Sequence, residues 1–179
     1  MEHIMYFTRH GETVWNVENK ICGATDIALT EKGRSQAEQL GEKILKENIR
    51  IDRIIYSPLS RAADTAEIIS EVTGIPAYEE VRLKEQNFGK YESTPRDGLE
   101  FAKAKENFIY SFEGGESMLK LCSRIYSVLD DVRADPENIY LLVAHNGISR
   151  AVESYFRDMT NGEFGAFGIH NCELRKYIF

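Results

Sequence analysis

The chain has 179 residues, of which 42% are hydrophobic and 28% charged, and its formal net charge is −7. This length and balance predict one globular domain over residues 1–179, with a sizeable buried core. The negative charge argues against a nucleic-acid partner, although a few clustered arginines could still bind a small anion. No apolar run approaches ~20 residues, which argues against a membrane-spanning helix.

The first half of the chain alternates strand and helix patterns. Residues 4–8 form a β-like run, and Thr30 can N-cap a following helix that has one apolar and one charged face. Residues 53–56 form a second β-like run. Pro58 suits the first turn of the next helix, and Gly74 suits its end.

The second half continues this alternation after a less regular stretch. Residues 92–113 mix charges, proline, glycine and aromatics, with a short helical pattern near residues 98–107, and they predict either a surface excursion or a small cap over a site. A helix is predicted over residues 116–133, a fully buried strand over residues 139–144 and a last helix from about Gly147. The whole pattern predicts a three-layer α/β/α sandwich around a mostly parallel sheet, with a short cap insertion.

The cysteines and the N-terminus bear on the compartment. Cys22, Cys122 and Cys172 are widely spaced and form no Cys-x-x-Cys pair, so they predict free thiols and neither a disulfide framework nor a zinc site. The segment Met1-Glu2-His3 does not begin a charged region followed by an apolar stretch, so no signal peptide is predicted. The expected location is the cytoplasm.

Polar side chains follow three of the predicted strands. They are Arg9 and His10 after the first, Ser57 and Arg61 after the second, and His145 after the third. The carboxyl ends of parallel strands share one edge of the sheet, where ligands bind in open α/β folds, so we expect these side chains to converge. Such a cationic cluster on an acidic protein indicates an anionic ligand, and guanidinium groups match phosphate oxygens bidentately.

This set of side chains suits phosphoryl transfer, which needs a nucleophile, charge neutralisation and a proton for the leaving oxygen. A neutral imidazole at His10 can attack phosphorus and form a covalent intermediate, and the arginines disfavour its protonation. The transferring group can be stabilised by Arg9, Arg61 and His145. A hydrogen-bond donor that is already in position before the reaction lowers the activation barrier by ~3 kcal/mol. Glu85 is the candidate acid for the leaving group, with a solvated loop carboxylate as the alternative. No acidic cluster predicts a metal site, and the scheme needs no cofactor.

Six ordered segments carry motifs that cover nearly the whole chain. They are Arg9-His10-Gly11-Glu12-Thr13 with Trp15-Asn16, residues 23–37, residues 56–66, residues 83–92, residues 114–117 and residues 143–147. Together they resemble the histidine phosphatase superfamily, also called phosphoglycerate-mutase-like. The resemblance implies a histidine nucleophile in the first segment, an arginine in the third, an acid donor in the fourth and a second histidine in the last.

The resemblance also implies individual roles. The phosphorylated residue would be His10, with Glu85 as acid and base. The phosphoryl group would be bound by Arg9, Arg61 and His145. The remaining phosphate- and substrate-binding residues would be Asn16, Cys22, Gly23 and Asn146. The glycine usual after Glu92 is Ser93 here, which leaves the path of that loop and the cap geometry open.

Three functions fit these motifs. The first is a phosphoric monoester hydrolase that cleaves small phosphate monoesters through phosphohistidine, favoured because a short excursion leaves the intermediate open to water. The second is a cofactor-dependent phosphoglycerate mutase, which must hold a second anion; the excursion offers mainly Arg96, Lys103 and Lys105, and residues 16–33 resemble the mutase version. The third, a non-catalytic phosphate-binding module, is least favoured because all core positions are intact. The expected partner is a small phosphorylated metabolite; its identity and the oligomeric state stay open.

Overall fold

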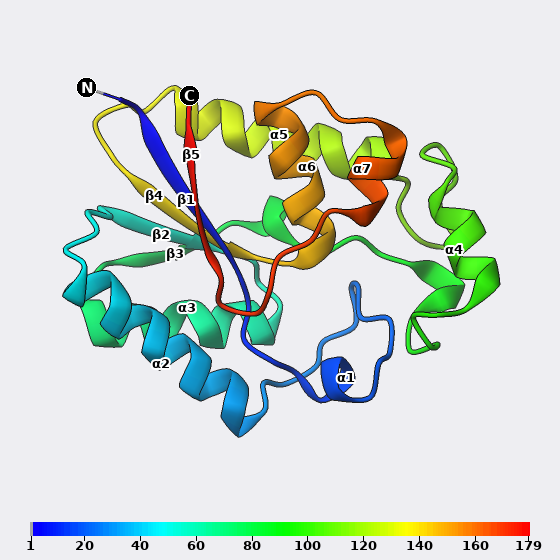
Figure 1. Cartoon of the computed structure of the whole chain (residues 1–179), viewed down its shortest axis with the longest axis horizontal. Coiled ribbons are helices and arrows are strands. Elements are labelled where there is room, and N and C mark those ends of the chain that lie inside the picture. The colour runs from blue at the N-terminus through cyan, green and yellow to red at the C-terminus, as the bar shows by residue number, and fades with distance from the viewer. Residues whose placement is uncertain (1) are drawn as a thin grey trace.

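A five-stranded sheet forms the centre of the computed structural model, which describes residues 2–179 (Figure 1). Its strands are β1 (Ile4–Arg9), β2 (Arg53–Tyr56), β3 (Ala77–Glu79), β4 (Tyr140–Ala144) and β5 (Leu174–Ile178). Their spatial order is β3-β2-β4-β1-β5, and only β5 runs antiparallel to its neighbour. The expected mostly parallel α/β sandwich is therefore confirmed.

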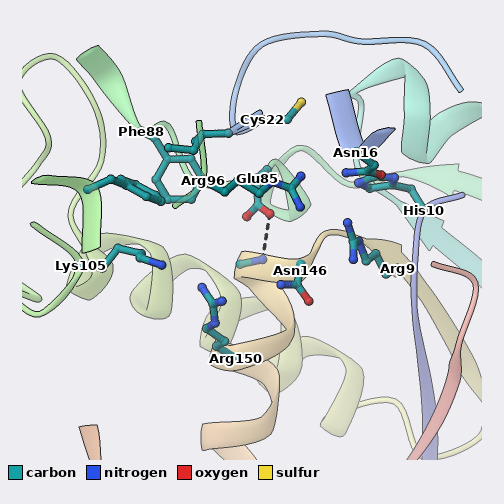
Figure 2. Close-up of a pocket in the computed structure, with 13 residues that line it drawn as sticks. Arg9, His10, Asn16, Cys22, Glu85, Phe88, Arg96, Lys105, Asn146 and Arg150 are labelled. Atoms are coloured by element: carbon teal, nitrogen blue, oxygen red, sulfur yellow. Dashed lines mark hydrogen bonds between the residues drawn. The ribbon is translucent and has the colours of Figure 1, made fainter. Parts of the chain in front are cut away.

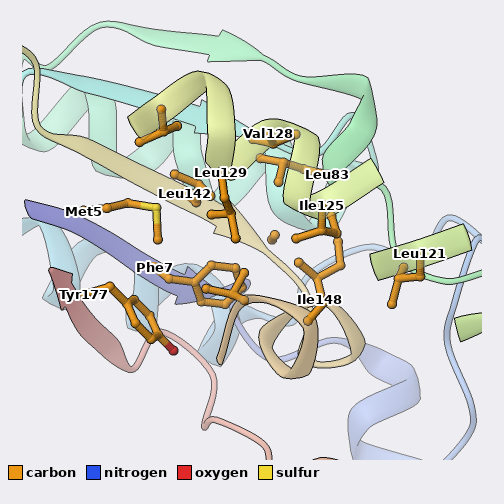
Figure 3. Packing of buried hydrophobic residues seen from close by; sticks show 14 of the residues in the cluster. Met5, Phe7, Leu83, Leu121, Ile125, Val128, Leu129, Leu142, Ile148 and Tyr177 are labelled. Carbon is orange, nitrogen blue, oxygen red and sulfur yellow. The ribbon is translucent and has the colours of Figure 1, made fainter. Parts of the chain in front are cut away.

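Helices cover both faces of this sheet (Figure 1). One face carries α2 (Glu31–Lys46) and α3 (Ser60–Thr73), and the other carries α5 (Met118–Arg133), α6 (Asn146–Phe156) and α7 (Asn161–Ala166). Successive β4 residues alternate between the two cores, which explains why the strand is apolar throughout. Figure 3 shows Phe7 and Leu142 of the strands beside Leu129 of α5 and Ile148 of α6.

Local chemistry sets the ends of the helices. Thr30 caps α2 as predicted, because its side chain accepts a hydrogen bond from the Gly33 N–H. The helix after β2 begins later than predicted, at Ser60, so Pro58 lies outside its first turn. The Ser60 N–H donates a hydrogen bond to the Asp26 carboxylate at 2.8 Å. A residue from a distant loop therefore pairs one of the backbone N–H groups that have no partner within the first turn of α3.

Several short elements were not predicted from the sequence. They are β3, β5, α1 (Val14–Val17), α7, and the 3₁₀ turns at Val81–Leu83 and Gly89–Tyr91. The two strands lie at the edges of the sheet, where few residues are buried and the apolar alternation is weak. The four-residue α1 depends on a capping box between Thr13 and Asn16.

The segment over residues 92–113 carries α4 (Leu99–Lys105), which stands apart from the three layers at one end of the molecule (Figure 1). It has its own small core, in which Phe101 and Phe112 pack with Phe88 and Ile21. No helix within residues 2–179 is long and apolar enough to cross a membrane. The cytoplasmic location and the single domain stay predictions, and Met1 lies outside the described residues.

Candidate active site

Three parallel strands end at one edge of the sheet and bring the polar residues together there. His10 follows β1, Ser57 follows β2 and His145 follows β4. The strand registers pair Arg9 with Ala144, so the two histidines leave the sheet side by side. Their imidazole centroids lie 5.2 Å apart. One phosphoryl group could therefore contact both rings.

The His10 ring is fixed in one tautomer. Its Nδ1 lies 2.7 Å from the Gly11 carbonyl oxygen, which can only accept, so Nδ1 carries the proton. The lone pair is therefore on Nε2. Burial, followed by the charges of Arg61 and Arg9, lowers the pKa of His10 well below its ordinary value. At neutral pH this residue is an uncharged imidazole with a free nucleophilic nitrogen.

The His145 ring is oriented in the opposite sense. Its Nε2 lies 2.7 Å from the Ser57 hydroxyl, which already accepts a hydrogen bond from the Leu59 N–H. The hydroxyl can donate its own proton to Nε2, and in that arrangement the ring proton of His145 is on Nδ1. That nitrogen is buried and has no partner within residues 2–179. Because burial and the nearby Arg61 lower the pKa of His145, its ring is uncharged at neutral pH, and with Ser57 as the donor to Nε2 its Nδ1–H can donate to a ligand.

Two arginines supply positive charge. Arg9 donates through Nη1 to the Ile169 carbonyl, and burial lowers its pKa to about 10, so it stays cationic at neutral pH. Arg61 is fully buried, and its two terminal nitrogens donate to the carbonyls of Gly23 and Thr25 at 2.7 and 2.8 Å. In this structure the Arg61 fork thus holds a loop and does not face the open pocket. The Nε atoms of both arginines are buried without a partner in the described chain.

Two asparagines present amide nitrogens to the pocket (Figure 2). The Asn16 side-chain oxygen accepts from the Thr13 N–H at 3.1 Å, and the Asn146 side-chain oxygen accepts from the Ile169 N–H at 2.9 Å. Since backbone groups occupy both oxygens, the NH₂ groups are the ends available to a ligand. Such donors suit the oxygens of an anion.

Glu85 lies in the pocket wall with 6% of its surface exposed, so it is not a solvated loop carboxylate. One carboxyl oxygen accepts from the Gln86 N–H at 2.9 Å. The other accepts from the Gly147 N–H at 2.8 Å, the dashed contact in Figure 2. A Cβ at position 147 would collide with this carboxyl group, so only glycine permits the contact. The start of α6 therefore aims the one carboxyl group that lines the pocket.

The pocket has a volume of about 120 Å³. Six of the residues predicted from the sequence line it: Arg9, His10, Asn16, Cys22, Glu85 and Asn146. Three others lie behind its walls. They are His145 and Arg61, both fully buried, and Gly23, whose carbonyl faces Arg61 and which therefore does not lie along the open pocket as expected. Burial raises the pKa of the Cys22 thiol, which keeps it protonated.

Glu92 organises the loop that holds Arg61, a role that the sequence did not reveal. Its carboxylate accepts from the backbone N–H groups of Gly23, Ala24, Thr25 and Phe88 and from the Thr25 hydroxyl, at 2.8 to 3.4 Å. The residue after it, Ser93, has φ 68°, the left-handed region that favours glycine. The loop thus takes a path suited to glycine although serine occupies the position.

Three further basic side chains line the pocket: Arg96, Lys105 and Arg150. The sequence identifies the first two only as charges in the excursion, and Arg150 was not predicted. The signal was present, because Arg150 lies four residues after Asn146 and therefore on the same face of α6. Within residues 2–179 no group of three or more His, Cys, Asp or Glu side chains could hold a metal ion.

Comparison with known proteins agrees with this geometry. Residues 5–179 match the model of the histidine phosphatase superfamily (branch 1). A protein of Erwinia tasmaniensis named probable phosphoglycerate mutase GpmB is 36% identical over 155 residues, covering 83% of this chain and 71% of that protein. A protein of the same name from Yersinia pestis is 34% identical over 180 residues, covering 96% of this chain and 83% of that protein.

Solved structures share the fold over nearly the whole chain. A mycobacterial glucosyl-3-phosphoglycerate phosphatase in complex with VO3 superposes with a TM-score of 0.85 at 26% identity, covering 97% of this chain and 90% of that one. YhfR of Bacillus stearothermophilus superposes with a TM-score of 0.82 at 27% identity, covering 97% and 89% of the two chains. These similarities extend over the sheet edge and the cap segment alike.

Proposed function

Because the chain belongs to branch 1 of the histidine phosphatase superfamily, we propose that it is a metal-independent phosphomonoesterase that works through a phosphohistidine at His10. The observation that carries this proposal is the state of the His10 ring. The Gly11 carbonyl binds the Nδ1 proton, which leaves an unprotonated Nε2 beside Arg9 in a pocket lined by amide donors. An uncharged imidazole in such a place is a nucleophile for phosphorus.

In the first step, Nε2 of His10 attacks the phosphorus atom and the ester P–O bond breaks. The leaving oxygen takes a proton from the Glu85 carboxyl group, which the Gln86 and Gly147 N–H groups hold in place. The Arg9 guanidinium neutralises charge on the equatorial oxygens, and the Nδ1–H of His145 donates a hydrogen bond to one of them. The products are the free alcohol and the phosphoryl-enzyme.

In the second step, Glu85, now a carboxylate, removes a proton from water. The resulting hydroxide attacks phosphorus, the P–N bond to His10 breaks, and inorganic phosphate leaves. His10 returns to its starting tautomer because the Gly11 carbonyl still binds the Nδ1 proton. Supporting this proposal, a structural neighbour at 26% identity carries the name of a phosphatase.

Phosphoglycerate mutase is the second candidate, favoured by the names of the relatives at 34% and 36% identity. A mutase transfers the phosphoryl group of the histidine to a second acceptor and must keep water away. The basic side chains Arg96, Lys105 and Arg150 in the pocket could hold the additional acid group that such a substrate carries. The two activities differ in one product, since only the phosphatase releases inorganic phosphate from each substrate molecule.

The test uses purified chain in the presence of a chelator. We expect release of inorganic phosphate from a generic aryl phosphate, and a loss of about ten-thousand-fold or more in His10→Ala, since removal of a nucleophile eliminates the covalent route. Wild-type turnover in His10→Ala, or dependence on an added metal, would contradict the proposal. Interconversion of phosphoglycerates primed by a bisphosphorylated cofactor, without phosphate release, would identify the mutase.

A further inference from the structure

Every backbone polar group of the loop that carries His10 has a hydrogen-bond partner. At the two ends of the loop, the His10 N–H donates to the Ala144 carbonyl and the Glu12 carbonyl accepts from the Thr30 N–H, both at 2.9 Å. The four groups between them belong to the two peptide planes on either side of Gly11. These planes decide where the Gly11 carbonyl points, and that carbonyl holds the proton of His10 on Nδ1.

The first plane joins His10 to Gly11 and is fixed at both ends. Its carbonyl oxygen accepts from the Asn171 side-chain amide at 2.7 Å. Its N–H donates to the Thr65 hydroxyl of α3 at 3.1 Å, and that hydroxyl donates its own proton to the Arg61 carbonyl at 2.6 Å. Because the hydroxyl proton is used in this way, a lone pair is left for the Gly11 N–H. The Thr65 side chain is fully buried, so bulk water does not reach this contact.

The second plane joins Gly11 to Glu12 and bears directly on the nucleophile. Its carbonyl oxygen is the one that His10 Nδ1 contacts at 2.7 Å. Its N–H donates to the side-chain oxygen of Gln36, on α2, at 2.9 Å. A peptide group is planar, with its N–H and C=O pointing in opposite directions, so a contact that holds the N–H also aims the carbonyl. Gln36 is therefore connected to the His10 ring through one rigid group.

Close packing of α2 against the loop supports this arrangement. A Cβ at Gly11 would collide with the Gly33 carbonyl, and one at Gly33 would collide with the Glu12 carbonyl, so loop and helix meet backbone to backbone. Neither Gln36 nor Thr65 lines the pocket. Any effect of these two side chains on the reaction must therefore pass through the loop.

We propose that Gln36 and Thr65 are positioning residues for the nucleophile. By holding the two peptides on either side of Gly11, they aim its carbonyl at His10 Nδ1 and keep the lone pair on Nε2, the atom that attacks phosphorus. This inference rests on the proposed function in one respect, the identity of His10 as the nucleophile. Because neither side chain touches the substrate, loss of either should lower kcat and leave KM nearly unchanged.

The tautomer of His10 can be measured by NMR without any turnover. In protein labelled with ¹⁵N in its histidines, protonated and unprotonated ring nitrogens resonate at well-separated frequencies. Their couplings to the ring protons distinguish Nδ1 from Nε2, and a His10→Asn variant identifies the His10 signals. At neutral pH, where the ring is uncharged, we expect the proton on Nδ1 in the wild type.

Gln36→Met tests the second plane, because it keeps the length of the side chain and removes the oxygen. The Gly11 carbonyl can then turn away, so a fraction of the His10 rings should carry the proton on Nε2. We expect kcat to fall about five- to tenfold, the effect of losing one hydrogen bond. Gln39→Met makes the same change at an exposed position of the same helix and should keep the wild-type tautomer and kcat.

Thr65→Val and Thr65→Ser test the first plane. Valine has the shape of threonine without the hydroxyl, so it should shift the His10 tautomer and lower kcat to a similar extent. Serine restores the hydroxyl and should return both quantities toward the wild-type values. Thermal unfolding curves identify the variants that are folded at the assay temperature. Gln36→Met, at a half-buried position, tests the proposal even where Thr65→Val folds poorly.

The outcomes separate this inference from the function on which it rests. An unchanged His10 tautomer in folded Gln36→Met would overturn the proposal, as would a fall in kcat that Gln39→Met shares. A Thr65→Ser variant as impaired as Thr65→Val would overturn the role of the Thr65 hydroxyl. A wild type that hydrolyses no ester, while the tautomer shifts as expected in the variants, would overturn the proposed function and leave the positioning of the ring intact.

Discussion

The sheet edge and the cap segment are built in different ways. At the edge, His10, Arg61 and His145 are buried, and contacts to backbone carbonyls or to Ser57 fix each of them. In the cap, a separate aromatic cluster around Phe101 supports α4. The side chain of Lys105, at the end of α4, lines the pocket from outside the sheet. Reacting groups thus lie in the rigid body, and groups suited to selecting a substrate lie on an appended segment.

This division has a consequence for variants. Changes at the edge should lower the turnover of every substrate alike, because they alter the nucleophile, the acid or the phosphate donors. Changes in the cap should alter the relative turnover of different substrates or the stability of the loop, with the chemistry intact.

Arg61→Lys should lower kcat by about 1,000-fold and leave the fold intact. A lysine has one nitrogen and cannot hold the Gly23 and Thr25 carbonyls together, nor supply a guanidinium beside His10. The measurement is kcat on several esters, together with circular dichroism and a thermal unfolding curve. Wild-type kcat in a folded variant would show that the buried arginine is a structural residue only.

Gly147→Ala should lower kcat by about 100-fold, because the new methyl group collides with the Glu85 carboxyl and displaces the acid. Alanine suits a helix better than glycine, so the stability of α6 itself should not suffer. If displacement of the acid is the cause, Glu85→Gln and the double variant should have nearly the same kcat as Gly147→Ala. Losses that multiply in the double variant would contradict this explanation.

Acid should destabilise the edge through its two histidines. Burial lowers the pKa values of His10 and His145 in the folded protein, while in the unfolded chain they return to about 6.5. As the pH falls below 6.5, the unfolded chain binds protons that the folded protein does not, so stability falls by up to about 1.4 kcal/mol per pH unit for each histidine.

Urea unfolding at pH 7.5, 6.5 and 5.5 measures this effect against a matched control. The double variant His10→Asn/His145→Asn retains all the carboxylates, whose contribution to the pH dependence then cancels in the comparison. Its free energy of unfolding should fall less steeply with acid than that of the wild type. Parallel curves for the two proteins would show that the buried imidazoles accept protons without unfolding.

Ser93→Gly should raise the stability of the cap loop by about 0.5 to 1 kcal/mol, because Ser93 has φ 68° and glycine removes the strain of the left-handed conformation. Turnover should not change, since Ser93 does not line the pocket. Chemical denaturation measures the sign of the change in the free energy of unfolding. Ser35→Gly, inside helix α2, is the control and should be destabilised. Equal losses in both variants would contradict the proposed strain.

The sequence predicts the sheet edge better than the cap, for a physical reason. Buried strands such as residues 139–144 and capped helices such as the one after Thr30 depend on local patterns, and the edge follows from the order of strands. The contacts of Glu92 with residues 23–25 join positions 67 to 69 apart along the chain. No local pattern encodes such a contact, so the Arg61 loop and the cap path could not be derived.

The tautomers of the two histidines show the same limit within the edge itself. Ser57 follows the second predicted strand, but no role could be predicted for it, because its contact with His145 depends on how a loop turns after β2. The position of Arg150 could have been inferred from its helical spacing to Asn146, whereas that of Lys105 depends on the packing of α4. Motifs locate reacting groups, while their hydrogen-bond partners require the folded structure.

The central claim concerns the nucleophile, and trapping the phosphoryl-enzyme tests it most directly. Wild type and His10→Ala are mixed with excess 4-nitrophenyl phosphate, quenched in alkali and analysed by intact and peptide mass spectrometry. We predict one acid-labile, alkali-stable phosphoryl group on His10 of the wild type and none on the variant. A phosphoryl group on any other residue, or steady turnover with no phosphorylated chain trapped at any quench time, would contradict the account.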